Sequence, residues 1–120
     1  MSDAIKHECG IALLLLKRPL EYYQQRYGSW TWGLEKMYLL MEKQHNRGQD
    51  GAGLATVKFD LPPGLRYMDR ARSNSSSPIK DVFAEVYAPL RNLSAKQLAD
   101  LDWVRTHVPF AGELFLGHLR

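Results

Sequence analysis

Residues 9–16 read CGIALLLL, a continuous apolar run that ends at Lys17, Arg18 and Pro19. The run is short for a helix and a proline stops it, so its length and its ending favour a strand, although periodicity alone does not separate the two. The run is also far short of the roughly 20 apolar residues that span a membrane. Its flanks lack a basic segment and a small-residue cleavage site. We therefore predict a buried strand and no membrane partner.

The composition is that of one soluble domain: 120 residues, 45% hydrophobic and 24% charged. The net charge of +3 and the pI near 9.1 raise nucleic-acid binding as an option, but the basic residues are scattered among 13 acidic ones. We expect no nucleic-acid partner. Cys9 is the single cysteine, which excludes an internal disulfide and a cysteine-based zinc site. A reducing, cytoplasmic location fits this cysteine usage.

Hydrophobic periodicity predicts several further elements. An apolar face at helical spacing runs from Leu34 to about Gln44, and a strand is expected at 54–59 with a partner strand at 65–71. A helix is predicted to begin at Pro78, with an apolar stripe that reaches Leu90. A capping box at 94–97 predicts a second helix through Val104, and a third strand is expected at 112–120. These elements indicate mixed α and β structure.

Three short motifs carry the chemistry: Cys9-Gly10-Ile11, the segment RGQDGAG at 47–53, and GHLR at 117–120. Together, and in this order, they resemble the C-G-I opening, the R-G-x-D-x-A-G segment and the G-H-x-R strand of class II glutamine amidotransferases. Residues 17–27 and 69–108 match no motif of that family. Three motifs in register are a specific signal, whereas any one of them could occur by chance.

The resemblance implies an α+β fold of the N-terminal-nucleophile hydrolase type, a four-layer αββα sandwich. It also implies that Cys9 is the nucleophile and that its own α-amino group is the base, so residues 1–8 would be a propeptide that is removed. An α-amino group has a reference pKa of about 7.7–8.0 against about 10.4 for lysine, and so part of it is neutral near pH 7. The neutral amine would accept the proton of the Cys9 thiol. The thiolate formed in this way would attack the side-chain amide of glutamine and release ammonia.

The other expected site residues follow from the same resemblance. Arg120 would hold the α-carboxylate of glutamine, a task suited to a planar fork of donors. Arg47 and Asp50 would organise the site without touching substrate, with an ion pair between them as an alternative. The family usually has histidine directly before the arginine of the second motif, but here Asn46 separates His45 from Arg47. His118 receives no catalytic role.

Gln49 makes the second motif most similar to that of amidophosphoribosyltransferases, which implies ammonia production for phosphoribosylamine synthesis in purine biosynthesis. The family's oxyanion-hole asparagine and glycine follow the G-H-x-R strand, so we expect residues 9–120 to be the truncated front of the domain and inactive alone. Phosphoribosyl pyrophosphate and magnesium would belong to an absent synthase domain. No cofactor is expected in this chain, and homo-oligomerisation is left open.

Two alternatives stay open. The first is the glutaminase domain of another class II amidotransferase with a different acceptor. The second is a non-catalytic binding module, which a Cys9 buried behind an uncleaved N-terminus would favour. In that case Cys9 would be a small hydrophobic residue at a strand start.

Overall fold

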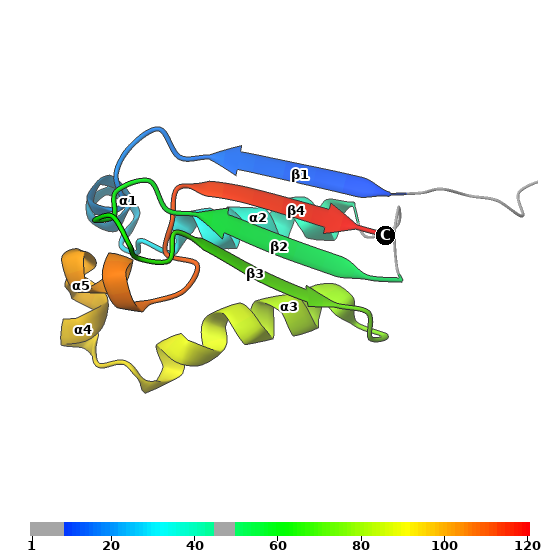
Figure 1. Cartoon of the computed structure of the whole chain (residues 1–120). Coiled ribbons are helices and arrows are strands. Elements are labelled where there is room, and N and C mark those ends of the chain that lie inside the picture. The colour runs from blue at the N-terminus through cyan, green and yellow to red at the C-terminus, as the bar shows by residue number, and fades with distance from the viewer. Residues whose placement is uncertain (1–8, 45–49) are drawn as a thin grey trace, which may run out of the picture.

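An antiparallel sheet in the order β1-β4-β2-β3 forms one layer of the molecule, and helices pack against one of its faces (Figure 1). The computed structural model describes residues 9–44 and 50–120, so the predicted propeptide, His45 and Arg47 lie outside the described residues. The four strands are β1 (Gly10–Leu15), β2 (Ala52–Val57), β3 (Met68–Ser73) and β4 (Leu114–Leu119). Within the described ranges the five α-helices are α1 (Leu20–Tyr27), α2 (Trp32–Lys43), α3 (Pro78–Tyr87), α4 (Ala95–Ala99) and α5 (Leu101–His107).

The predicted first strand exists, but it is buried on one face only. Ala12 is buried, whereas Ile11 and Leu13 are 76% and 61% exposed. Successive side chains of a strand point to opposite faces, and helices cover only one face of this sheet. The prediction of a buried strand was therefore right for one face and wrong for the other, which carries half of its side chains.

Helix α2 packs against β1 and β4 (Figure 1). Its predicted apolar face includes Leu34, Met37 and Met41, all of which are buried. A Cβ atom built on Gly117 would lie 2.7 Å from Met41 Sδ, which is closer than real Cβ contacts. The glycine of the third motif therefore allows α2 to pack closely against β4, and this role is structural.

Helix α3 begins at Pro78 as predicted and packs against β2 and β3. Its apolar stripe is buried through Val86, and the chain then continues as a short 3-10 turn, η2 (Ala88–Asn92). The predicted capping box is present: Ser94 Oγ accepts from the Gln97 amide at 3.1 Å. The single helix expected behind it is divided instead into α4 and α5. Asp100 breaks it, adopting an extended backbone and capping α5 by accepting from the Trp103 amide.

Helix α1 was missed because its sequence is largely polar and aromatic and shows no clear apolar stripe. Only Leu20 and Tyr23 are buried in it. Its aromatic rings attach it to α2, since the Tyr23 and Tyr27 rings stack on Trp32 with centroid separations of 5.1 and 5.0 Å. Stacked aromatic pairs of this kind add to the stabilisation from buried area.

Strands β2 and β3 form the predicted antiparallel pair, but both are displaced from the expected ranges. β2 begins two residues earlier than predicted, because Gly53 is a strand residue paired with Arg72 and not a break before the strand. β3 begins later than predicted and ends at Ser73. This displacement decides which side chains of β3 lie on each face.

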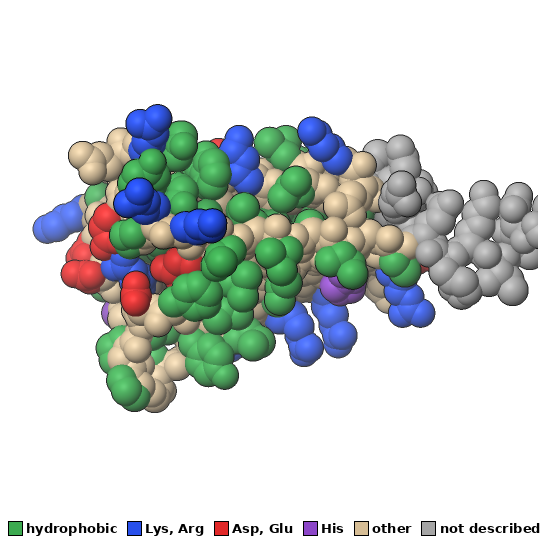
Figure 2. All heavy atoms as spheres, turned by 90° about the horizontal axis from the view of Figure 1, so that it is seen from above, with side chains coloured by type: hydrophobic (Ala, Val, Ile, Leu, Met, Phe, Trp, Pro, Cys, Tyr) green, Lys and Arg blue, Asp and Glu red, His purple; other side chains and the backbone are tan. Residues whose placement is uncertain are grey.

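The described part is thus a compact α+β fold with one face of its sheet uncovered. Large hydrophobic side chains gather on the side of the molecule seen in Figure 2. The exposed ones on the uncovered face of the sheet are Ile11, Leu13, Leu15, Leu116 and Met68. The second sheet of an αββα sandwich is not among the described residues.

Candidate functional site

The two motifs at opposite ends of the sequence meet at one end of the sheet. Gly10 of β1 pairs with Leu119 of β4, so the next residues outward on these neighbouring strands are Cys9 and Arg120. Paired residues of an antiparallel ladder have Cα atoms about 4.5–5.5 Å apart. Cys9 is exposed, so its thiol is open to solvent rather than part of the core.

The second motif joins the same end of the sheet from the other side of β4. The Arg120 amide donates to the Gly51 carbonyl at 2.9 Å, and the Gly51 amide donates back to the Arg120 carbonyl at 3.2 Å. The Asp50 amide also donates to the Arg120 carbonyl, at 2.6 Å. These bonds fix Asp50 beside Arg120 through the backbone, independently of their charges.

Gln44, at the end of α2, supports the start of β1. Its Nε2 donates to the Ile11 carbonyl at 3.1 Å. A Cβ atom on Gly10 would lie 2.5 Å from Gln44 Oε1 and 3.2 Å from Gln44 Cβ. The glycine after Cys9 therefore makes room for a helix-end side chain that positions the strand next to the thiol. Gln44 could not be predicted as a site residue, because nothing in its local sequence pattern indicates a contact 33 residues away.

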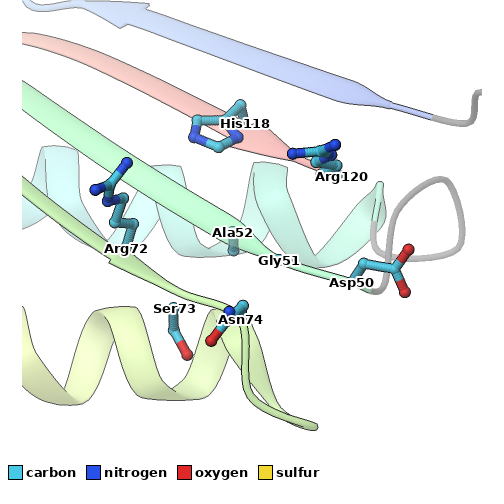
Figure 3. A pocket seen from close by; sticks show the side chains of 8 residues that line it. All are labelled: Asp50, Gly51, Ala52, Arg72, Ser73, Asn74, His118 and Arg120. Atoms are coloured by element: carbon cyan, nitrogen blue, oxygen red, sulfur yellow. The ribbon is translucent and has the colours of Figure 1, made fainter.

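A cavity of about 590 Å³ opens beside Arg120, over β2 and β3 (Figure 3). Arg72 from β3, and His118 and Arg120 from the end of β4, supply its basic side chains, and Asp50 supplies its single carboxylate. The remaining lining residues are small or polar: Gly51, Ala52, Ser73 and Asn74. Cys9 stands on the other side of β4 from this cavity. The site therefore consists of a thiol at one strand start and a basic cavity across the neighbouring strand.

The His118 ring lies over Gly53. A Cβ atom on Gly53 would come within 2.4 Å of His118 Nε2, so only glycine leaves the ring this position. Beyond His118, a second cavity of about 310 Å³ continues along β2, with Gly53 and Ala55 in its floor and Arg70 in its wall. Small side chains on β2, between taller ones on β3 and β4, explain this hollow. The glycine of the second motif thus shapes the cavity surface.

The basic side chains of the cavity have no side-chain partners among the residues that the structure describes. Within residues 9–44 and 50–120, no ion pair or side-chain hydrogen bond involves Arg72, His118 or Arg120. Arg66 and Arg105, in contrast, are ion-paired with carboxylates. An unpaired guanidinium facing a cavity is suited to hold an anionic group by two parallel hydrogen bonds.

Of the expected site residues, Cys9, Asp50 and Arg120 are brought to the same end of the sheet. Arg47 lies outside the described residues, as does any ion pair between it and Asp50. His118 lies on the same side as Arg120, as strand alternation predicts, and it lines the cavity. Arg72 was missed, because its position becomes evident only from the register of β3 against Gly53.

The described ranges hold no group of three or more His, Cys, Asp or Glu side chains placed to bind a metal ion. None of the helices described is long and apolar enough to cross a membrane.

No family model matches the sequence, and no curated protein or solved structure matches it either.

Proposed function

We propose that this chain is the glutaminase part of a class II glutamine amidotransferase, which releases ammonia from glutamine through a thioester on Cys9. One observation carries the proposal. Motifs separated by more than a hundred residues along the chain converge at one end of the sheet, where Cys9 and Arg120 follow a paired position of adjacent strands. A chance occurrence of the motifs gives no reason for them to meet.

Cys9 is suited to be the nucleophile because it is exposed and sits at the start of a strand. After removal of residues 1–8, its α-amino group would take the thiol proton, and the thiolate would attack the side-chain carbonyl carbon of glutamine. The tetrahedral intermediate collapses to a thioester when the C–N bond breaks, and the protonated amine returns its proton to the leaving ammonia. Water then hydrolyses the thioester to glutamate and free Cys9.

Arg120 is suited to bind the substrate α-carboxylate. It lines the cavity, it has no carboxylate partner among the described residues, and its main chain is held by three hydrogen bonds to Asp50 and Gly51. A guanidinium on a fixed backbone loses little further freedom when it binds a carboxylate. Asp50, held through its own backbone amide, would keep the end of β4 in place.

The uncovered apolar face supports the proposed αββα sandwich. Contiguous exposed hydrophobic surface of this kind usually marks an interaction site. In the proposed fold a second sheet covers it, since two sheets pack face to face about 10 Å apart. Cys9 and the cavity would then lie at the open end between the two sheets, protected from bulk water on one side.

We further propose that the ammonia serves phosphoribosylamine synthesis from phosphoribosyl pyrophosphate. This choice of acceptor rests on Gln49, which lies outside the described residues. A class II amidotransferase with another acceptor is the alternative, and replacing phosphoribosyl pyrophosphate by other acceptors in the synthesis assay separates the two.

The test uses Cys9→Ser in the full-length protein, assayed for synthesis with glutamine and, separately, with ammonia. Glutamine-dependent synthesis should be abolished, because only ammonia production needs the thiolate, and ammonia-dependent synthesis should be retained. Glutamine-dependent synthesis that survives in Cys9→Ser would exclude Cys9 as nucleophile. A wild-type protein that binds glutamine without releasing ammonia would favour the binding module.

A further inference from the structure

Arg72 shares the cavity with Arg120, although no motif contains it. On the uncovered face, Arg72 of β3 pairs with Gly53 of β2, and Gly53 pairs with His118 of β4. Arg72 and His118 therefore lie two strand spacings apart across the sheet, about 10 Å. Arg120 lies two residues beyond His118 along the same strand direction, about 7 Å further. Figure 3 shows Arg72 rising from β3 on the side of the sheet that carries His118 and Arg120.

Nothing on the intervening strand separates these side chains. Gly53 has no side chain, and it belongs, with Arg72 and His118, to the lining of the smaller cavity that continues from the main one. Both guanidiniums can therefore reach a group placed over β2. A ligand lying there would contact Arg72 from one side and Arg120 from the other.

The charge balance of the cavity favours an anion. Neither arginine has an acidic partner in the described part of the chain, and Asp50 is the single carboxylate of the lining. Two cations facing one space repel each other unless an anion lies between them. A carboxylate satisfies both, because its two oxygens together offer about four acceptor positions.

We propose that Arg72 is a second anchor for the α-carboxylate that Arg120 holds, and that the pair selects a free amino acid over a glutamine residue within a peptide. The proposal rests on the proposed glutaminase function. A peptide bond in place of the carboxylate removes the negative charge and one acceptor oxygen, so it leaves the two guanidiniums without a counter-charge. Arg72 is a positioning residue and takes no part in bond breaking.

Arg70 is the matched control. It lies on the same strand and the same face as Arg72, two residues further from the end that carries Cys9. It is exposed like Arg72, but it lines the smaller cavity and not the main one. Removing either arginine changes the net charge equally, so a difference between the two variants reports position rather than charge.

The test measures binding of L-glutamine and of its α-carboxamide, glutaminamide, to the full chain carrying Cys9→Ala, so that no substrate is consumed. The parent should bind glutamine about tenfold or more tighter than glutaminamide, since hydrogen bonds between charged groups are the strong ones. Arg72→Ala should weaken glutamine binding about tenfold and Arg120→Ala by more than about tenfold, and both should leave glutaminamide binding unchanged. Arg70→Ala should stay within about twofold of the parent, and Arg72→Lys should lie between Arg72→Ala and the parent because it keeps the charge but loses the fork.

The outcomes separate this proposal from the glutaminase function. If Arg72→Ala binds glutamine like the parent while Arg120→Ala is weakened, the second anchor is excluded and the proposed function stands. If the parent binds no glutamine, the proposed function falls, and acetate is then titrated while the side-chain Nε–Hε signals of both arginines are followed by NMR. Shifts of both signals along one binding curve would support the shared carboxylate site, whereas a shift of Arg120 alone, or of neither, would overturn it.

Discussion

At one end of the sheet Lys58, which follows β2, is buried and hydrogen-bonded to the protein, whereas at the other end Arg120, which follows β4, is exposed and faces a cavity. Lys58 is 7% exposed, and its Nζ donates to the Arg105 and Val108 carbonyls at 2.7 and 2.6 Å. A cation at those last carbonyls of α5 also suits the negative end of the helix. Burial lowers the pKa of Lys58, and the nearby carboxylates of Asp69 and Glu113 oppose that shift.

Three further buried charged groups at the Lys58 end, Asp69, Glu113 and Arg105, are also bonded to the protein. The Asp69 carboxylate accepts from the Phe110 amide at 3.1 Å, and Glu113 Oε1 accepts from the Phe59 amide at 3.0 Å. Arg105 pairs with Asp102 and Glu21, although its Nε is buried and has no hydrogen-bond partner among the described residues. Acidic side chains gather at this end in Figure 2. This chain thus pairs charges where they hold the fold, whereas the described residues give Arg72 and Arg120 no ionic partner, and this difference is the basis for proposing a ligand there.

We expect Lys58→Met, at the end of the sheet where charged groups are bonded to the protein, to give the largest loss in the free energy of unfolding. It leaves the buried Arg105 and Val108 carbonyls without their donor and removes the positive charge near the Asp69 and Glu113 carboxylates. Leaving a buried acceptor without its partner typically costs about 1–3 kcal/mol for each group. Urea denaturation measures the free energy of unfolding. Arg72→Met is the control from the cavity end and should change it by less than about 0.5 kcal/mol, because Arg72 is exposed and makes no ion pair with any described residue. If the two variants lost equal free energy of unfolding, the charged groups at the two ends of the sheet would not differ in their contribution to stability.

Arg120→Ala should have the opposite profile, with little effect on stability and a large effect on glutamine use. We expect kcat/KM for glutamine to fall by the equivalent of about 2–4 kcal/mol, the scale for truncating one partner of a desolvated charge pair. Steady-state kinetics of the full-length protein measures it. An unchanged kcat/KM would mean that the arginine of the third motif holds no carboxylate here.

The smallest effect concerns Glu113, whose pKa is raised by burial, an effect that the bond from the Phe59 amide opposes. The folded chain therefore holds this proton to a higher pH than the unfolded chain does. Stability from this group is complete below the unfolded pKa of about 4.3 and declines as pH rises through the folded value. Glu113→Gln keeps an acceptor for Phe59 and should remove that decline, which denaturation curves between pH 4 and 7 would reveal. A steeper decline in the variant would show that the charged form stabilises the fold.

The sequence predicted the elements whose patterns are local. The stripe of α3, its N-terminal proline and the capping box at Ser94 each depend on residues a few positions apart, and all are present. α1 escaped prediction because aromatic stacking on α2, rather than an apolar stripe, holds it. The run from Ile11 to Leu15 was predicted to be buried because periodicity cannot reveal that the described residues cover only one face of the sheet.

The candidate site was predictable only through motifs. Cys9, Asp50 and Arg120 were identified from short patterns, and the register then brought them to one end of the sheet. Arg72 could not be found in this way. Its place depends on Gly53 being a strand residue, whereas the local sequence suggested a turn. Strand register is a property of long-range pairing, and one residue of displacement moves a side chain to the opposite face.

The most direct test of the central claim, that Cys9 acts with its own α-amino group, compares two forms of the full-length protein. One form begins at Cys9 and the other retains residues 1–8, with intact mass confirming each N-terminus and Cys9→Ala as the blank for both. The measurement is ammonia released from L-glutamine. The predicted result is release only by the form that begins at Cys9, because an amide nitrogen in place of the amine cannot accept the thiol proton. Equal release by the form that retains residues 1–8 would contradict the mechanism.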